Sequence, residues 1–296
     1  MSRRYLVAGK KSRRYNYNRR PLWPKPHRYR YKMPIEFKLI KLAIILLFVF
    51  LLLLTTSNIG NKSKANHIQD KITALEVPVE VTEKIFTKAK NNNKDAASLL
   101  ASYVVGKKPG FFSSRQSKKN YKEAVDCYKQ FIFDLERFPI DRNYDYAYED
   151  TWRSERTYGG SRKHYGTDIM DRQNKRSSIP IVSMSSGQVE NIGWNDMGGY
   201  RIGVRTKNGA YIYYAHLDKY APNIEKGSMV ESGDLLGYMG DSGYGKEGTV
   251  GKFQVHLHIG IATKAFGSDE EWVNPYYLLK YLEKKDVEIL KSRGIF

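Results

Sequence analysis

Cysteine is almost absent from the sequence, because Cys127 is the single one among 296 residues. An internal disulfide framework and a zinc finger built on several cysteines are therefore excluded. Wholesale disorder is excluded as well, since 41% of the residues are hydrophobic and 13% are aromatic. The length fits one large domain, or one domain with additional segments.

Acidic residues are nearly missing from the N-terminal segment. Residues 1–41 hold fourteen Lys and Arg but a single acid, Glu36, which gives a formal charge of +13. The other 255 residues hold 36 basic and 30 acidic residues, a charge of only +6. A basic tail over 1–38 that contains tyrosines could bind nucleic-acid phosphates or anionic lipids. We interpret it as a cytoplasmic topology determinant, and no nucleic acid is expected as a partner.

Polar side chains are absent from residues 42–54, which read LAIILLFVFLLLL. As a helix, residues 39–59 would span about 31 Å, close to the roughly 30 Å hydrocarbon core of a bilayer. The preceding segment is too long for a signal-peptide n-region and no A-x-A site follows, so a retained transmembrane helix is predicted. Thirteen Lys and Arg precede Leu39. The positive-inside rule then predicts a single-pass protein of the cell membrane, with its N-terminus cytoplasmic and its C-terminal domain extracellular.

Residues 60–144 carry no chemical motif and are predicted to be an extracytoplasmic linker and helical spacer. Asp95 is a candidate N-cap for one helix. Apolar residues recur at spacings of three and four between Tyr121 and Leu135, which predicts an amphipathic helix with Cys127 as a small packing residue inside it. A surface that binds envelope protein partners within 60–144 is an open alternative.

The sequence changes character after about residue 145, where glycines become frequent and apolar residues alternate. Asn208-Gly209 is a strong hairpin signal, because both positions tolerate positive φ. The domain over 145–296 is therefore predicted to be mainly β, with antiparallel pairing. Strands are expected over 201–206, 210–217 and 253–262, and a closing helix over 275–292.

Four of the six histidines lie in this β domain. Three residues separate His164 from Asp168 in the sequence, and one residue separates His256 from His258. Because side chains at i and i+2 of a strand share a face, His256 and His258 are expected to project together, about 6–7 Å apart. His216 stands between the two pairs, in a tyrosine-rich strand.

Two neutral imidazoles and one carboxylate that converge can bind a zinc ion and leave its fourth position to water. Such an ion lowers the pKa of the water toward about 7 and polarises a carbonyl oxygen. Two further histidines nearby can transfer protons or stabilise developing charge. An H-x-H pair alone is more often two hydrogen-bonded polar residues. Its combination with H-x-x-x-D and a further histidine favours a metal site.

Three segments carry a resemblance to a known family. They are YGGSRKHYGTDIM (158–170), YIYYAHL (211–217) and VHLHIGI (255–261). They resemble the M23 metallopeptidases, the LytM or lysostaphin-type peptidoglycan endopeptidases, over roughly residues 145–275. The resemblance implies a barrel-like antiparallel β catalytic domain over 145–296, preceded by the transmembrane helix and the helical spacer.

The resemblance also implies roles for individual residues. His164, Asp168 and His258 would bind one Zn²⁺ per chain, while His216 and His256 would act as general base and electrostatic helper, in an order left open. Tyr158 stands where several relatives have a tyrosine that stabilises the oxyanion. The implied activity is that of a membrane-anchored zinc metalloendopeptidase that hydrolyses amide bonds in the peptide part of peptidoglycan.

Two other functions compete with this hydrolase. A non-catalytic scaffold or wall-binding subunit of an envelope complex, such as a sporulation complex, could use the same fold. A lipoyl- or biotinyl-type carrier domain is suggested by ESGDLLG (231–237), but residues 183–187, SMSSG, offer no lysine at the comparable turn. The complete histidine and aspartate set favours the hydrolase over both.

Overall fold

The computed structural model describes residues 35–91, 95–158, 160–268 and 270–292. Most of the predicted basic tail over 1–38 lies outside these residues. The chain divides into two compact units, Met1–Ser57 and Asn58–Phe296, and each is considered by itself.

The described part of the first unit is helical. The helix α1 (Ile35–Ala74) includes the helix expected over 39–59. Its large apolar side chains between Ile35 and Leu52 are exposed, as at Leu42 (52%) and Phe48 (65%). Within the part of the chain that the structure describes, no helix is both long enough and apolar enough to cross a membrane. The predicted transmembrane span is therefore not supported by the structure.

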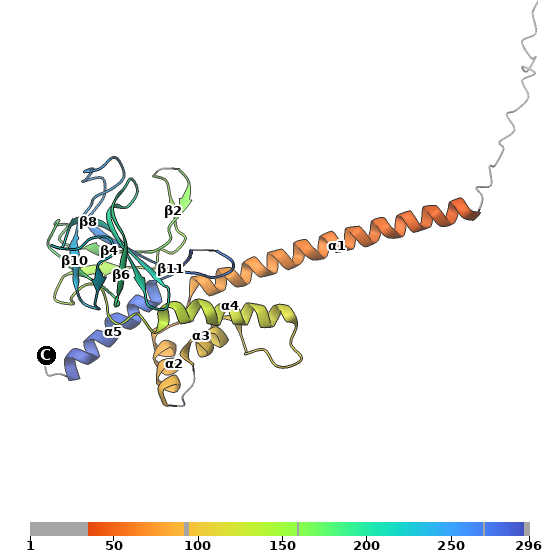
Figure 1. Cartoon of the computed structure of the whole chain (residues 1–296), viewed down its shortest axis with the longest axis horizontal. Coiled ribbons are helices and arrows are strands. Elements are labelled where there is room, and N and C mark those ends of the chain that lie inside the picture. Colours follow the sequence, from red (N-terminus) through yellow and green to blue (C-terminus); the bar gives the residue numbers. More distant parts are fainter. Residues whose placement is uncertain (1–34, 92–94, 159, 269, 293–296) are drawn as a thin grey trace, which may run out of the picture. The chain divides into compact units, whose positions relative to one another are not determined.

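Short helices precede the sheet in the second unit (Figure 1). The Asp95 side chain caps one of them as expected, because its Oδ1 accepts the Ala97 backbone N–H at 3.0 Å. The bounds are α2 (Val79–Asn91), α3 (Ala96–Val105) and α4 (Arg115–Ile132).

The predicted amphipathic helix is α4, and its apolar stripe is buried. Val125, Tyr128 and Ile132 are all less than 9% exposed. The helix ends at Ile132, three residues before the predicted Leu135, which is itself buried. The Tyr128 hydroxyl donates to the Ile72 carbonyl at 3.1 Å, so this stripe also contacts the C-terminal part of α1.

Among the residues that the structure describes, the sheet has ten strands, and all of its pairings are antiparallel. The main path runs β1-β4-β11-β8-β7-β6-β9, with β10 on β8 and β5, and β12 on β11. A separate hairpin joins β2 to β3. The bounds are β1 (Tyr146–Tyr148), β2 (Glu155–Arg156), β3 (Arg162–Lys163), β4 (Thr167–Asp171), β5 (Pro180–Val182), β6 (Gly187–Asn195), β7 (Gly199–Thr206), β8 (Tyr211–Tyr220), β9 (Met229–Val230), β10 (Leu235–Met239), β11 (His256–Thr263) and β12 (Glu271–Val273).

The expectation of barrel-like closure is wrong, whereas mainly antiparallel β structure is confirmed. β1 and β9 end the main path, and no pairing joins them among the described residues. Closure requires the two edge strands to pair along a consistent register. Strands of three and two residues offer too few backbone groups to do so.

The predicted hairpin is the β7–β8 pair. The Gly209 N–H donates to the Thr206 carbonyl at 3.1 Å, and the Thr206 N–H donates to the Ala210 carbonyl at 2.9 Å. Gly209 adopts φ +100, whereas Asn208 is not among the residues with positive φ. Glycine is therefore required at one of the two predicted positions only.

The helices of 60–144 and the sheet share one hydrophobic cluster. Cys127 Sγ on α4 lies 3.2 Å from Thr263 Oγ1 on β11, and the Asn274 N–H donates to the Thr73 carbonyl of α1 at 2.7 Å. The closing helix α5 (Tyr276–Ser292) begins one residue after its predicted start. The segment predicted as a spacer is thus packed against the β domain.

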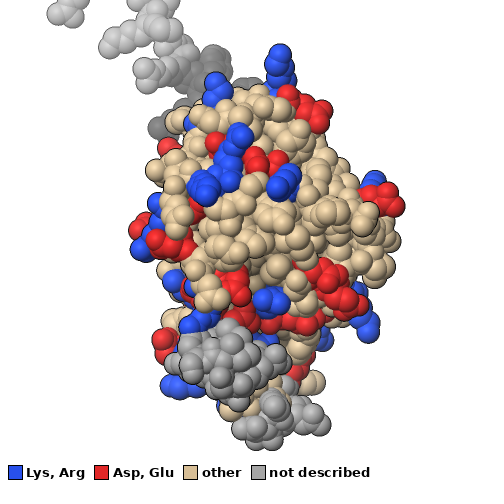
Figure 2. Space-filling view, turned by 90° about the vertical axis from the view of Figure 1, so that its left-hand side faces the viewer, with Lys and Arg blue, Asp and Glu red and all other residues tan. Residues whose placement is uncertain are grey.

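Charge is mixed on the face of the molecule shown in Figure 2, where Lys and Arg lie interspersed with Asp and Glu. This agrees with the small formal charge of the chain after residue 41, which is +6. The large excess of positive charge belongs to the N-terminal 41 residues.

We predict that Cys127 does not react with thiol reagents in the folded chain. Burial raises the pKa of its thiol to about 12, and its side chain has no exposed surface. At about pH 8 the thiol therefore stays protonated, and the thiolate is the reactive form. Ellman's reagent should label the full chain only in denaturant, and Cys127→Ser should remove that signal. Labelling of the folded chain at the rate of a free thiol would contradict the packing of α4 on β11.

Candidate metal centre

Three adjacent strands carry most of the predicted site. Asp168 lies on β4, His258 on β11 and His216 on β8. In the antiparallel register, His258 is paired with Asp168 on one side and with Ala215 on the other. His164 joins them from the segment between β3 and β4. Strand pairing, not nearness in sequence, therefore brings these residues together.

Each of the three predicted metal ligands places one nitrogen or oxygen atom close to those of the other two. His164 Nε2 lies 3.0 Å from Asp168 Oδ1 and 3.0 Å from His258 Nδ1. His258 Nδ1 lies 2.9 Å from Asp168 Oδ1. Ligands of a tetrahedral zinc ion, at about 2.0–2.2 Å from the metal, are about 3.3 Å apart. The observed triangle is only slightly smaller.

The hydrogen-bonding roles of these three ligand atoms indicate that a cation binds between them. His164 Nδ1 lies 3.1 Å from the Thr151 carbonyl, which can only accept, so Nδ1 carries the ring proton. In the neutral ring, Nε2 is then a bare lone pair that faces the Asp168 carboxylate. Two acceptors at 3.0 Å repel each other unless a positive ion lies between them. Two imidazoles and a carboxylate are ligands that suit zinc, so these residues fit Zn²⁺.

The loop 151–154 positions His164. The His164 N–H donates to the Ser154 carbonyl at 2.9 Å, and the Arg153 N–H donates to the His164 carbonyl at 2.7 Å. Thr151 Oγ1 lies 3.0 Å from His164 Nδ1. Contacts of this kind around a metal ligand hold the ring in one orientation and one tautomer.

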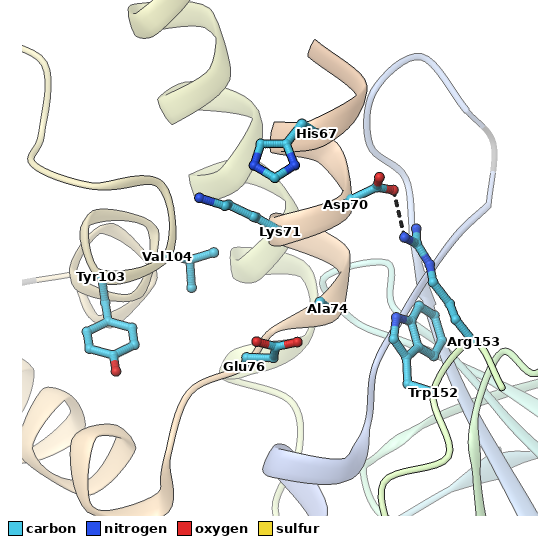
Figure 3. Close-up of a pocket in the computed structure, with 9 residues that line it drawn as sticks. All are labelled: His67, Asp70, Lys71, Ala74, Glu76, Tyr103, Val104, Trp152 and Arg153. Atoms are coloured by element: carbon cyan, nitrogen blue, oxygen red, sulfur yellow. Dashed lines mark hydrogen bonds and ion pairs between the residues drawn. The ribbon is translucent and has the colours of Figure 1, made fainter. Parts of the chain in front are cut away.

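The C-terminal end of α1 braces this loop (Figure 3). The Arg153 guanidinium donates to Asp70 Oδ1 at 2.7 Å and to Thr73 Oγ1 at 3.3 Å. Arg153 also adopts φ +56, an uncommon conformation for a residue with a side chain. An open cavity of about 530 Å³ lies beside this contact, lined by His67, Asp70, Lys71, Ala74, Glu76, Tyr103, Val104, Trp152 and Arg153.

Asp168 has a second partner that the sequence did not predict. Its Oδ2 accepts from Arg156 Nη2 at 2.7 Å while Oδ1 faces the histidines. Asp168 is therefore an anion available to a metal. No spacing rule links Arg156 to the ligands, so only the fold identifies it.

The imidazoles of His216 and His256 line the same pocket, and His256 Nε2 lies 3.8 Å from Asp168 Oδ1. His216 Nδ1 lies 2.8 Å from the Ser242 carbonyl, and His256 Nδ1 lies 2.7 Å from the Gln254 carbonyl. Both Nδ1 atoms are thus donors, which leaves each Nε2 as an acceptor. The two ring centroids are 4.7 Å apart. Burial keeps the pKa of His216 well below its ordinary value, so its imidazole is neutral.

His216 departs from the regular strand that the sequence predicts over 210–217. Its φ is +62, and its N–H donates to the Gly198 carbonyl at 2.8 Å. The register of β7 on β8 shifts between Tyr200 and Ile202, close to this point. Irregular strand geometry of this kind redirects a side chain next to an active site.

The Tyr158 side chain contacts Tyr244. Its hydroxyl donates to the Tyr244 carbonyl, and its ring stacks on the Tyr244 ring with centroids 4.1 Å apart. Tyr244 lines the pocket, whereas Tyr158 is not among the lining residues. The oxyanion role of Tyr158 stays a prediction. The pocket is lined by Arg156, Arg162, His164, Asp168, Met197, Gly198, Tyr213, Ala215, His216, Tyr244, His256 and His258.

Comparisons with known proteins match the part of the chain that contains this site. The family model described as Peptidase family M23 matches residues 162–275. The chain is 42% identical over 151 residues to the L-Ala–D-Glu endopeptidase of Bacillus subtilis, which covers 51% of this chain and 45% of that protein. It is 34% identical over 107 residues to lysostaphin from Staphylococcus simulans, which covers 36% and 19% respectively. The chain thus spans less than half the length of these curated relatives.

A crystal structure from Ruminococcus gnavus, of a protein assigned as the glycyl-glycine endopeptidase LytM, is similar over more of the chain. The sequence identity is 41% and the TM-score is 0.57. The match covers 72% of this chain and 90% of that one.

We predict that Gly166→Ala weakens metal binding. A Cβ at Gly166 would lie 2.5 Å from His258 Cε1 and 2.6 Å from the Ile259 carbonyl oxygen, so the ligand ring would have to move. Displaced metal ligands or their supports typically reduce affinity by about 10- to 100-fold. Competition with a chromophoric zinc chelator would measure this loss.

Gly110→Ala is the matched control, because a Cβ at Gly110 would have no atom within 4 Å and the φ of this residue is not in the left-handed region. It should bind zinc as the wild type does. Equal affinity of the Gly166→Ala and wild-type chains would show that the His258 ring is not held where the structure has it.

Proposed function

The chain belongs to peptidase family M23, and we propose that it is a zinc metalloendopeptidase that cleaves an amide bond in the peptide part of peptidoglycan. One observation carries the proposal. Three ligand atoms of His164, Asp168 and His258 lie 2.9–3.0 Å apart, beside the imidazoles of His216 and His256, whose Nδ1 atoms face backbone carbonyls and whose Nε2 atoms are therefore acceptors. The similarity to the L-Ala–D-Glu endopeptidase of Bacillus subtilis supports a bond between an alanyl and a glutamyl residue.

The site separates the metal ligands from the groups that move protons. Bound at the three ligands, Zn²⁺ supplies Lewis acidity toward the scissile carbonyl and toward water. His216 or His256 accepts the proton of the attacking water at Nε2, while its Nδ1–H stays on a backbone carbonyl. The imidazolium then donates that proton to the leaving amine nitrogen, which completes hydrolysis.

A non-catalytic scaffold is the weaker alternative. A scaffold would need neither free imidazole acceptors nor a complete ligand set, and both are present in this pocket. Binding of envelope proteins to residues 60–144 stays a prediction.

We also propose that the chain is held in the cell membrane by residues 39–59, with the β domain outside. The uninterrupted apolar run over 42–54 and the thirteen basic residues before Leu39 support this arrangement. Peptidoglycan lies on the same side of the membrane as the proposed catalytic domain.

We predict about one zinc ion per full chain, and loss of most of it in His164→Ala and in His258→Ala. Each variant removes one of three ligands and leaves the carboxylate without a complete site. Metal analysis of the purified protein measures the content. His67→Ala, which removes a histidine outside the metal centre, should keep its zinc. Full zinc occupancy in both ligand variants would refute the assigned site.

We predict that His216→Asn keeps zinc but loses about 10²- to 10⁴-fold in activity, the usual contribution of a general acid or base. Asn tolerates the φ of +62 at this position, so the backbone should be retained. Release of new amine termini from purified wall measures the activity. A fully active His216→Asn protein would leave His256 as the proton acceptor.

A further inference from the structure

Among the described residues, two guanidinium groups and one carboxylate line the pocket of the metal centre. The charged lining residues are Arg156, Arg162 and Asp168. Arg156 and Asp168 are paired, with Arg156 Nη2 at 2.7 Å from Asp168 Oδ2. Arg162 therefore has no carboxylate partner among the residues that line the pocket.

The contacts of Arg162 are with neutral groups. Its Nε donates to the Tyr158 carbonyl at 3.3 Å, and its Nη2 donates to the Tyr244 hydroxyl at 3.0 Å. The guanidinium carbon lies 5.9 Å from the centroid of the Tyr244 ring. No ion pair of Arg162 is found among the residues that the structure describes. These contacts use two of the five N–H donors of a guanidinium, so donors remain for a ligand in the pocket.

We propose that Arg162 binds a free carboxylate of the substrate, on the residue that follows or precedes the scissile amide. The inference rests on the proposed function, because the same pocket contains the metal ligands. A planar guanidinium is the side chain best suited to bind a carboxylate through two hydrogen bonds. The two contacts with the β2–β3 hairpin and Tyr244 hold it in place before the substrate arrives.

A glutamyl residue provides such a carboxylate. It has two carboxyl groups, uses one to continue the peptide and keeps the other free, whichever way it is linked. In an alanyl–glutamyl amide that free carboxylate lies within a few bonds of the scissile nitrogen. A glycyl–glycine amide has no such group. Arg162 therefore makes the pocket selective for an acidic residue over its amide.

Peptide pairs test this selectivity in the full chain. The two peptides share an L-Ala–D-Glu bond and differ only in the free carboxyl of the glutamyl residue, which is a carboxylate in one and a primary amide in the other. Both the dissociation constant and kcat/KM are measured, for the wild type, Arg162→Gln, Arg162→Lys and Lys163→Gln. Lys163 is the matched control, because it lies next to Arg162 on β3 but forms its ion pair with Glu155 at 2.9 Å, outside the pocket.

We expect the wild type and Lys163→Gln to prefer the carboxylate peptide by about tenfold or more, the size of one charge-assisted hydrogen bond. Arg162→Gln should bring the ratio close to one and leave the amide peptide within about threefold of the wild type. Arg162→Lys, which keeps the charge without the fork, should keep part of the preference.

Two results would overturn the inference. One is equal binding of both peptides by the wild type. The other is an equal loss for both peptides in Arg162→Gln, which would mean that Arg162 only holds the β2–β3 hairpin on Tyr244. If the zinc-loaded wild type binds the carboxylate peptide selectively but cleaves neither peptide, the carboxylate site stands and the proposed hydrolysis falls.

Discussion

The pairing register of β4 on β11 is the constraint on which the metal centre depends. It places Asp168 directly opposite His258, so that a carboxylate oxygen and an imidazole nitrogen meet at 2.9 Å. A slip of one residue would turn Asp168 to the other face of the sheet, because side chains alternate along a strand. The buried Ile169 and Leu257, which pair with each other on the opposite face, make that slip unfavourable. The hydrophobic core thus determines the geometry of the site.

A second set of contacts positions His164, which the sheet itself does not hold. His164 lies outside the regular strands, and backbone hydrogen bonds with the loop 151–154 hold it. That loop is tied to the end of α1 through Arg153 and Asp70. Gly166 leaves room for the His258 ring beside it. Ligand geometry therefore depends on residues from α1, the loop and the sheet together.

Part of this site could be predicted from the sequence. The spacing of His256 and His258 predicts one shared face, and both side chains do line one pocket. The alternation of polar and apolar residues predicts antiparallel strands, which the structure confirms, but it contains no information on whether edge strands meet. Arg156 and Arg162 could not be predicted, because their partners lie on other segments and follow no local spacing rule. The positive φ of His216 could not be predicted either, because it depends on tertiary packing.

The shared core of the helices and the sheet has a practical consequence. The match to the family model begins at residue 162. The glycine-rich sequence with alternating apolar residues begins near residue 145. A recombinant fragment cut at either point would lose Ile72, Tyr128 and Phe131, which are fully buried in the intact chain. A fragment that begins at 145 would also lack Asp70, the acidic partner of Arg153, and one that begins at 162 would lack Arg153 itself. Soluble material for crystallisation should start upstream of Ile72, within the polar stretch that follows the apolar run.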